Sequence, residues 1–271
     1  MAFLDPVLVA ELLLLGTCTG FLAGLLGVGG GMLMVPFLTM MLTHQGVETG
    51  LAVKMAIATA MTTIMFTSVS SVRAHQKRGA VRWDIVRHMA PGIVVGALVA
   101  GVGVFALIKG RALAVAFAGF VGFSAVQMLR GGKPEAARQM PGTLGSAAAG
   151  GVVGFVSGLV GAGGAFISVP FMTWCNVPIH LATGTSAALG FPIAAANTLG
   201  YVIGGWNLHT GVPGSLGFVV LPAMAVISLA SVVTAPIGAK VAHGMDTRQL
   251  KRVFALLLFS LAGYMTWRAI S

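Results

Sequence analysis

The sequence predicts an all-α polytopic membrane protein, built from two homologous repeats of about four hydrophobic segments each. Of its 271 residues, 57% are apolar and only 8% are charged, a composition foreign to soluble globular domains. The charges are also unevenly placed, because residues 139–239 contain no Lys, Arg, Asp or Glu. One membrane span needs about 20 apolar residues, so the chain has room for several.

An internal repeat indicates the two-part organisation. The stretch GFLAGLLGVGGGMLMVPFLTM at residues 20–40 returns as GFVSGLVGAGGAFISVPFMTW at residues 154–174. Five glycines, a Pro-Phe pair and a threonine recur in register. Duplicated units of this kind are the usual construction of secondary transporters. Glycine adopts positive φ and permits close backbone approach, so we expect a membrane helix to break at each GxGG motif.

The hydrophobic segments follow the repeat. In repeat 1 (residues 1–129) we expect them at 7–42, 51–72, 89–108 and 112–129. In repeat 2 (residues 143–271) we expect them at 143–175, 180–204, 216–239 and 250–267. The first segment of each repeat is too long for one ordinary span and should break at 27–31 or 161–164. Residues 130–142, RGGKPEAARQMPG, form a polar linker that we place in the cytoplasm.

Loop charge predicts that the repeats are inverted. The loops at 73–88, 130–138 and 240–252 are basic, whereas 205–215, the counterpart of 73–88, has no formal charge. The positive-inside rule then places the basic loops in the cytoplasm and 205–215 outside. Equivalent loops lie on opposite sides only if the first segment of each repeat is a hairpin that returns to the side it entered. The alternative is eight plain crossings, with parallel repeats and a violated charge bias in one half.

The remaining composition excludes several classes of function. The net charge of +10 comes from short loops between spans, so we expect a lipid bilayer and no nucleic acid as partner. The two cysteines match neither disulfide nor metal spacing, and we expect no cofactor. HExxH, GxSxG and paired intramembrane carboxylates are all missing, so we expect no enzyme. The N-terminus lacks a basic region, so the first segment should not be a cleaved signal peptide.

The glycine motifs are the first candidate site. A broken helix presents unpaired N–H groups and a positive dipole end, which suit an anion. Irregular backbone at membrane depth is tolerated only inside protein or beside a water-filled cavity. We therefore expect the two breaks to meet centrally and line a substrate site, through Gly27, Gly29, Gly30, Gly31, Gly161, Gly163 and Gly164. The alternative is that these glycines only allow close helix packing.

Polar side chains after the glycine motifs are the second candidates. The sequence ATGTS at residues 182–186 brings Thr185 and Ser186, and its degenerate twin at 58–60 brings Thr59. These hydroxyls, and the amide of Asn197, are candidate donors to an oxyanion. Interhelical hydrogen bonding is the alternative role for them.

Two basic side chains complete the predicted site. Lys54 and His180 occupy equivalent positions, one in each repeat, and either attract anions or lie at the headgroup level. No Asp or Glu lies deep in any segment, which disfavours a cation pathway. An anionic substrate fits the composition better.

The paired motifs GLLGVGGGMLMVPFL and GLVGAGGAFISVPFM, followed by the AxGTS-like turns, resemble the sulfite exporter TauE/SafE family of bacterial inner-membrane permeases. The resemblance covers nearly the whole chain. It implies export of a small sulfur-containing anion, sulfite or an organosulfonate, across the cytoplasmic membrane. The first copy departs from the second, because Ala58-Thr59-Ala60 replaces Gly184-Thr185-Ser186.

We therefore expect a multi-pass transporter of the bacterial inner membrane that exports such an anion by alternating access. A passive anion channel, a transporter of another small anion and a non-transporting scaffold are the alternatives. The sequence also allows a homo-oligomer.

Overall fold

The computed structural model describes residues 5–26, 29–130, 138–208, 210–242 and 247–270. Within these residues the chain is helical apart from one ribbon of two short strands. Seven of the described helices are long and apolar enough to cross a membrane. They cover Pro6–Leu25, Thr49–Gln76, Trp83–Leu107, Gly110–Gln127, Thr143–Val160, Ile179–Gly204 and Leu221–Ala242. The prediction of a helical protein with many membrane spans is confirmed.

The elements follow one another in two halves. The first half contains α1 (Pro6–Leu26), α2 (Gly31–His44), α3 (Thr49–Gln76), α4 (Trp83–Leu98), the π-helical stretch η1 (Val99–Val104), α5 (Phe105–Leu107) and α6 (Gly110–Arg130). The second contains α7 (Thr143–Val160), α8 (Ala165–Trp174), α9 (Ile179–Gly204), the antiparallel strands β1 (Ser215–Leu216) and β2 (Val219–Val220), α10 (Leu221–Ala242) and α11 (Thr247–Ile270).

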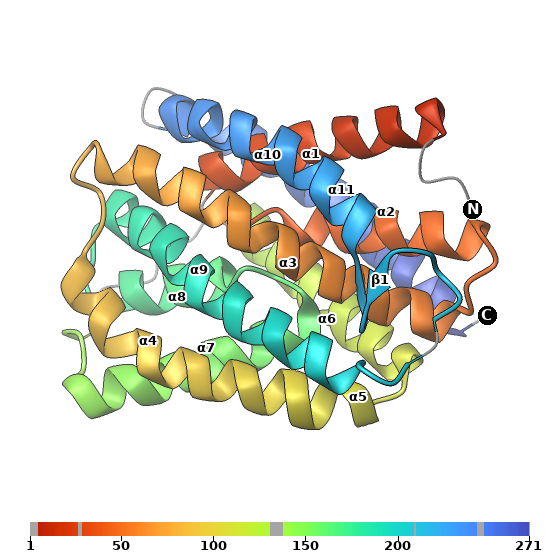
Figure 1. Ribbon diagram of the computed structural model, residues 1–271. Helices are drawn as coiled ribbons and strands as arrows, with labels where there is room; N and C mark the ends of the chain where they lie inside the picture. Colours follow the sequence, from red (N-terminus) through yellow and green to blue (C-terminus); the bar gives the residue numbers. More distant parts are fainter. Residues whose placement is uncertain (1–4, 27–28, 131–137, 209, 243–246, 271) are drawn as a thin grey trace.

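Both long first segments are broken, as the glycine motifs predict. Helix α2 begins directly after Gly30 (φ 75°), and α8 begins directly after Gly164 (φ 78°). This left-handed conformation is one that glycine adopts without steric cost. In Figure 1, α2 runs back towards the side of the bundle on which α1 begins, and α8 runs back towards the side on which α7 begins. Each broken segment is therefore a hairpin.

The basic loop between the second and third segments is shorter than the sequence suggested. Helix α3 continues to Gln76 and α4 already begins at Trp83, so only residues 77–82 connect them. The extra turn of α4 is stabilised by Ile85, Val86 and Met89, which are buried at helical spacing. In the second half of the chain, residues 215–220 form the β ribbon. The expected segment 216–239 is therefore helical only from Leu221.

Helices α3 and α9 form the centre of the bundle. They pack against each other, α10 lies against α3, and α4 lies against α9 (Figure 1). In its most apolar 18-residue window α3 is 72% buried and α9 56%, against 33–39% for the other candidate spans. The outer helices expose large apolar side chains, such as Leu229 and Val233 on α10. Such a surface is suited to lipid rather than water.

Small residues bring two outer pairs of helices into close contact. Helix α1 packs on α10, and α7 packs on α4. A Cβ atom added at Gly92 of α4 would lie 1.8 Å from the carbonyl oxygen of Ala147 on α7, and one at Gly24 of α1 would lie 1.9 Å from that of Ala235 on α10. The backbones touch because these positions have no side chain, which is the usual solution for helix packing in membranes.

We expect Gly92→Ala to destabilise the protein, because the added methyl group forces α4 and α7 apart. Overpacking of this kind costs about 1–3 kcal/mol. The matched control is Gly119→Ala in α6, where an added Cβ meets nothing within 4 Å. That change should be neutral or slightly stabilising. Thermal unfolding of the detergent-purified variants, followed by tryptophan fluorescence, checks both, and equal midpoints would contradict the packing argument.

Candidate functional site

The two glycine breaks lie against each other in the middle of the bundle. A Cβ atom added at Gly31 would lie 2.0 Å from the carbonyl oxygen of Gly161, and one at Gly29 would lie 3.2 Å from the Cα atom of Gly163. The two chain reversals therefore touch backbone to backbone. This is the meeting of breaks that the repeat predicts, although Gly27 lies outside the described residues.

The helices that start at the breaks have no side-chain cap. Neither Gly30 before α2 nor Gly164 before α8 can supply one. The first N–H groups of a helix have no partner inside the helix, and they carry the positive end of its dipole. Two such helix starts close together make the centre of the protein favourable for negative charge.

A small cavity lies beside the contact between the breaks. Its volume of about 10 Å³ is about enough for one water molecule. It is lined by Ala23, Gly29, Ile64, Thr67, Ser68, Ser71, Gly163, Ser186, Ala187 and Gly190. Both glycine breaks and both central helices thus contribute to one site, and its lining contains no acidic side chain.

Four hydroxyl-bearing residues line this cavity, and one of them has an unpartnered hydroxyl group. Ser186 Oγ lies 2.8 Å from Ser168 Oγ, Thr67 Oγ1 lies 2.7 Å from Ser231 Oγ, and Ser68 Oγ donates to the carbonyl oxygen of Met65 (3.0 Å). Ser71 Oγ is buried and has no hydrogen-bond partner among the described residues. The hydroxyls of Thr39, Ser157 and Ser228 are likewise buried without a partner among the described residues, and Ser71 is the one of the four that lines the cavity.

Sequence reasoning named only three of the residues that line this cavity, Gly29, Gly163 and Ser186. It missed Thr67 and Ser68 as site residues, and it treated Ser71 only as the symmetry mate of Asn197. A signal was present, because Ile64, Thr67, Ser68 and Ser71 recur at the spacing of one helix face in an apolar segment.

The predicted donors Thr59 and Thr185 lie outside the cavity. Thr59 Oγ1 accepts a hydrogen bond from the backbone N–H of Val220 (3.0 Å), and Thr185 Oγ1 accepts one from that of Arg82 (2.9 Å). Val220 and Arg82 directly precede α10 and α4. Each threonine therefore anchors the start of a helix in the opposite half of the chain.

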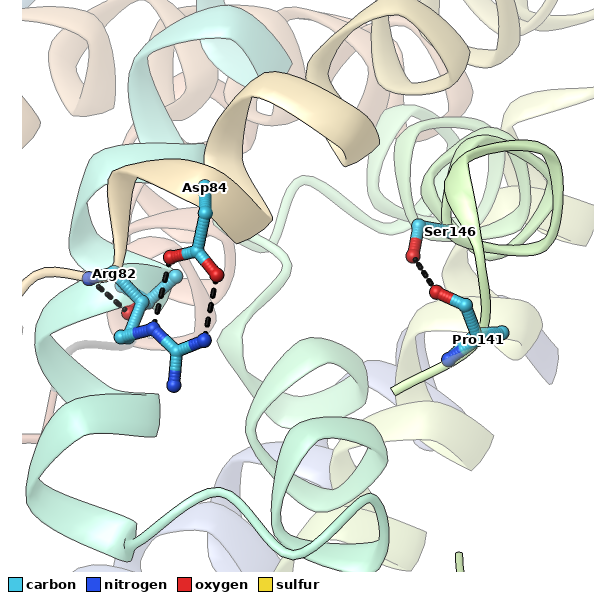
Figure 2. Close-up of polar contacts among 5 residues, drawn as sticks. Arg82, Asp84, Pro141 and Ser146 are labelled. Atoms are coloured by element: carbon cyan, nitrogen blue, oxygen red, sulfur yellow. Dashed lines mark hydrogen bonds and ion pairs between the residues drawn. The ribbon is translucent and has the colours of Figure 1, made fainter. Parts of the chain in front are cut away.

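Further polar contacts fix the chain near Thr185. The guanidinium group of Arg82 forms two hydrogen bonds with the carboxylate of Asp84 in the first turn of α4, at 2.8 and 2.5 Å (Figure 2). Nearby, Ser146 Oγ donates to the carbonyl oxygen of Pro141 (2.9 Å) at the start of α7 (Figure 2). These contacts hold the beginnings of the two helices that pack together.

Side chains of α3 and α9 also hold the broken helices one turn before each break. The hydroxyl of Tyr201 donates to the carbonyl oxygen of Gly158 on α7, and His75 Nε2 lies 3.2 Å from the carbonyl oxygen of Gly24 on α1. Asn197 donates to the carbonyl oxygen of Ile193 (2.9 Å) and packs against Gly158. Asn197 thus contacts α7 rather than the cavity.

The two predicted basic residues lie at different ends of the bundle, away from the cavity. Lys54 is near the beginning of α3, and about 21 Å of helix separates it from Ser68. Its Nζ atom donates to the carbonyl oxygen of Ala106 (2.9 Å) and borders a second pocket. His180 is exposed at the beginning of α9. Within the described residues, no three His, Cys, Asp or Glu side chains lie close enough to hold a metal ion.

Comparison with known proteins gives a consistent result. The family model described as sulfite exporter TauE/SafE matches residues 12–265. A probable membrane transporter protein of Haemophilus influenzae is 33% identical over 251 residues, which are 92% of this chain and 95% of the relative. A probable membrane transporter protein of the archaeon Methanocaldococcus jannaschii is 24% identical over 96% of this chain and 94% of its own. No solved structure matches.

We expect Thr59→Val to destabilise the protein, because it leaves the buried N–H group of Val220 without its acceptor. Such a loss costs about 1–3 kcal/mol. Thr183→Val is the matched control in a central helix, since Thr183 is only partly buried and its hydroxyl bonds the preceding turn of α9. Thermal unfolding should show a lower midpoint for Thr59→Val alone. Similar midpoints for the two variants would mean that the contact with Val220 contributes nothing.

Proposed function

Because the chain belongs to the sulfite exporter TauE/SafE family of membrane transporters, we propose that it exports a small sulfur-containing anion, sulfite or an organosulfonate, across the cytoplasmic membrane. One observation carries this proposal: two uncapped helix starts meet beside a cavity that is lined by hydroxyl groups and by no carboxylate. In this reading the substrate site comprises Gly29, Gly30, Gly31, Gly161, Gly163, Gly164, Ser71 and Ser186.

The chemistry of this site suits an oxyanion. N–H and O–H groups are the donors that sulfite or sulfonate oxygens require, and a helix start stabilises a partly buried anion by about 0.3–2 kcal/mol. The unpartnered hydroxyl of Ser71 would donate to one of these oxygens. Since a full positive charge is missing from the lining, the anion is held by neutral donors and can leave again.

Entry of an anion requires movement, because the cavity holds about one water molecule. The glycine-packed pairs α1–α10 and α4–α7 are suited to move as rigid units, and α3 and α9 form the contact between them. Across that contact Thr62 Oγ1 lies 3.2 Å from Thr198 Oγ1. We propose that one unit rocks against the other and opens the site to each side in turn, as in other transporters with repeats.

Several contacts support two inverted repeats, at residues 1–129 and 143–271. The pair α1–α10 corresponds to the pair α7–α4. The bond between Thr59 and the start of α10 corresponds to that between Thr185 and the start of α4. The contact of His75 with Gly24 corresponds to that of Tyr201 with Gly158. The separation of Thr59 from His75 along α3 equals that of Thr185 from Tyr201 along α9. In this arrangement 77–82, 130–138 and 240–252 are cytoplasmic and 205–215 is outside.

The orientation predicts opposite accessibility for two loops. In a background with Cys18→Ala and Cys175→Ala, we expect Asn207→Cys to react with a membrane-impermeant maleimide in intact spheroplasts. Lys77→Cys, in the basic loop, should react only after permeabilisation. Labelling of both variants before permeabilisation would place the two loops on one side and rule out the inverted arrangement.

Transport is tested directly with proteoliposomes loaded with sulfite, sulfoacetate or sulfate, with and without a pH gradient. We expect saturable efflux of sulfite or sulfoacetate, and its response to the gradient reports the coupling to protons. Flux that rises linearly with concentration would instead indicate a passive channel. Absence of flux for all three anions would overturn the proposed substrate class.

Two substitutions test the central cavity in the same assay. Gly29→Val should abolish efflux, because it puts a β-branched side chain at φ 77° within 3.2 Å of Gly163. Ser71→Ala should lower kcat/KM about tenfold or more, the value of one hydrogen bond to an anion. The matched controls Gly119→Val and Ser124→Ala lie in α6, and the Ser124 hydroxyl bonds its own helix (2.8 Å). Full activity of well-folded Ser71→Ala would remove Ser71 from the site.

A further inference from the structure

A second, larger pocket lies at the end of the bundle where α3 begins and α9 ends. It is open, its volume is about 480 Å³, and its wall includes Glu48, Lys54, Lys109, Arg111, Leu208 and Phe218. This volume is in the range of small-molecule sites. The pocket is distinct from the central cavity, with which it shares no lining residue.

Positive charge dominates the wall of this pocket. Lys54, Lys109 and Arg111 face a single carboxylate, that of Glu48. Both oxygens of Glu48 are occupied, because they accept hydrogen bonds from the backbone N–H groups of Gly50 and Leu51 at 3.0 Å each. In the part of the chain that the structure describes, none of the three cations lies within ion-pair distance of a carboxylate. The wall of the pocket thus carries three positive charges against one negative charge, and none of the three cations is held in an ion pair.

The fold holds these cations together. The π-helical stretch η1 leads into α5, and the chain then turns at Ile108 so that α6 starts at Gly110. A Cβ atom added at Gly110 would lie 2.0 Å from the carbonyl oxygen of Gly50, so this turn is pressed against the start of α3. Lys109 and Arg111, which flank Gly110, therefore share one pocket with Lys54. A π-helical stretch often marks a functional site.

Lys54 is pre-organised in the wall. Its Nζ atom donates to the carbonyl oxygen of Ala106 (2.9 Å) and lies 5.5 Å from the centre of the Phe218 ring. An ammonium group has three donors, so others stay available for a ligand. Capping the end of α5 explains the position of Lys54. It does not explain why Lys109 and Arg111 share the same pocket.

The location adds a second argument, which rests on the orientation in the proposed function. This end of the bundle would be the outer end, where the positive-inside rule disfavours Lys and Arg. The neighbouring loop 205–215 follows the rule and has no formal charge. The three cations of the pocket break the rule, so topology does not account for them.

We propose that this pocket is a second anion site, at the outer mouth of the transport path, which binds small sulfonates and related oxyanions. The planar guanidinium group of Arg111 can bind two oxygens of a sulfo group at once, and the lysines supply further donors. The Phe218 ring offers an apolar surface to the carbon chain of an organosulfonate. The phosphate of an anionic lipid has the same donor requirements, and the experiment separates the two sources.

The test places a reporter thiol in the pocket by Leu208→Cys, in the Cys18→Ala and Cys175→Ala background and in nanodiscs of zwitterionic lipid. Leu208 is 41% exposed, so the thiol can be reached. We compare its reaction rates with the anionic 2-sulfonatoethyl and the cationic 2-(trimethylammonium)ethyl methanethiosulfonate. The anionic reagent should react faster, and sulfoacetate should slow it saturably at constant ionic strength.

Removal of two exposed charges by Lys109→Gln and Arg111→Gln should lower the anionic-to-cationic rate ratio about tenfold, because the local potential falls. It should also abolish protection by sulfoacetate. The matched control Lys77→Gln with Arg87→Gln removes two charges near the other end of the bundle and should change neither quantity. Both variants leave Lys54 and its helix-end contact in place.

Three results would overturn the proposal. The first is a rate ratio that the pocket variant leaves unchanged, and the second is a lack of protection by sulfoacetate in zwitterionic nanodiscs. The third is protection that arises only with phosphatidylglycerol, which would assign the pocket to a lipid headgroup. The labelling assay does not depend on transport. Protection by sulfoacetate in a protein that exports none of the three anions would therefore overturn the proposed function and still support this site.

Discussion

The structure depends on a backbone contact that any side chain would prevent. The chain reverses twice in the interior, and the two reversals touch where the Cβ of any other residue at position 31 would lie 2.0 Å from the carbonyl oxygen of Gly161. An open turn at membrane depth would leave N–H and C=O groups in hydrocarbon at a cost of several kcal/mol each. Here each break shields the other, and α3 and α9 shield both. The hairpins, the central cavity and the uncapped helix starts follow from this one contact.

Buried polar side chains keep the surrounding helices in position. Thr59 and Thr185 anchor the starts of α10 and α4, while His75 and Tyr201 hold α1 and α7 one turn before the breaks. All four are buried, and each reaches a backbone atom in another helix or directly before one. The hydroxyl groups of Thr59, Thr185 and Tyr201 fix one helix relative to another without burying a charge. The interior is therefore polar enough to orient the breaks and apolar enough to remain in a membrane.

Much of this could be predicted from the sequence, because the signals are local. The charge-free runs indicate the spans, and the two GxGG motifs indicate the breaks and their meeting. The roles of Thr59 and Thr185 could not be predicted, since their partners Val220 and Arg82 are far away in sequence and contribute only a backbone N–H group. The cavity face of α3 was missed for a related reason. Ser68 and Ser71 resemble ordinary helix serines until the neighbouring glycines leave room beside them.

Charged side chains line the outer pocket and are missing from the lining of the central cavity, and the proposed transport gives a physical reason for this. A lysine or arginine beside the breaks would be costly to bury and would bind an anion too tightly for release. Neutral donors bind more weakly, and conduction needs a site that a ligand can leave. Weak binding at the centre requires a raised anion concentration at the entrance, which fixed cations at a wetter rim supply. Lys54 lies about four turns of helix from Ser68 and shares its pocket with Lys109 and Arg111. Hydroxyl-bearing residues and helix starts occupy the centre. In the proposed transport path the two sites would thus divide attraction and release between them.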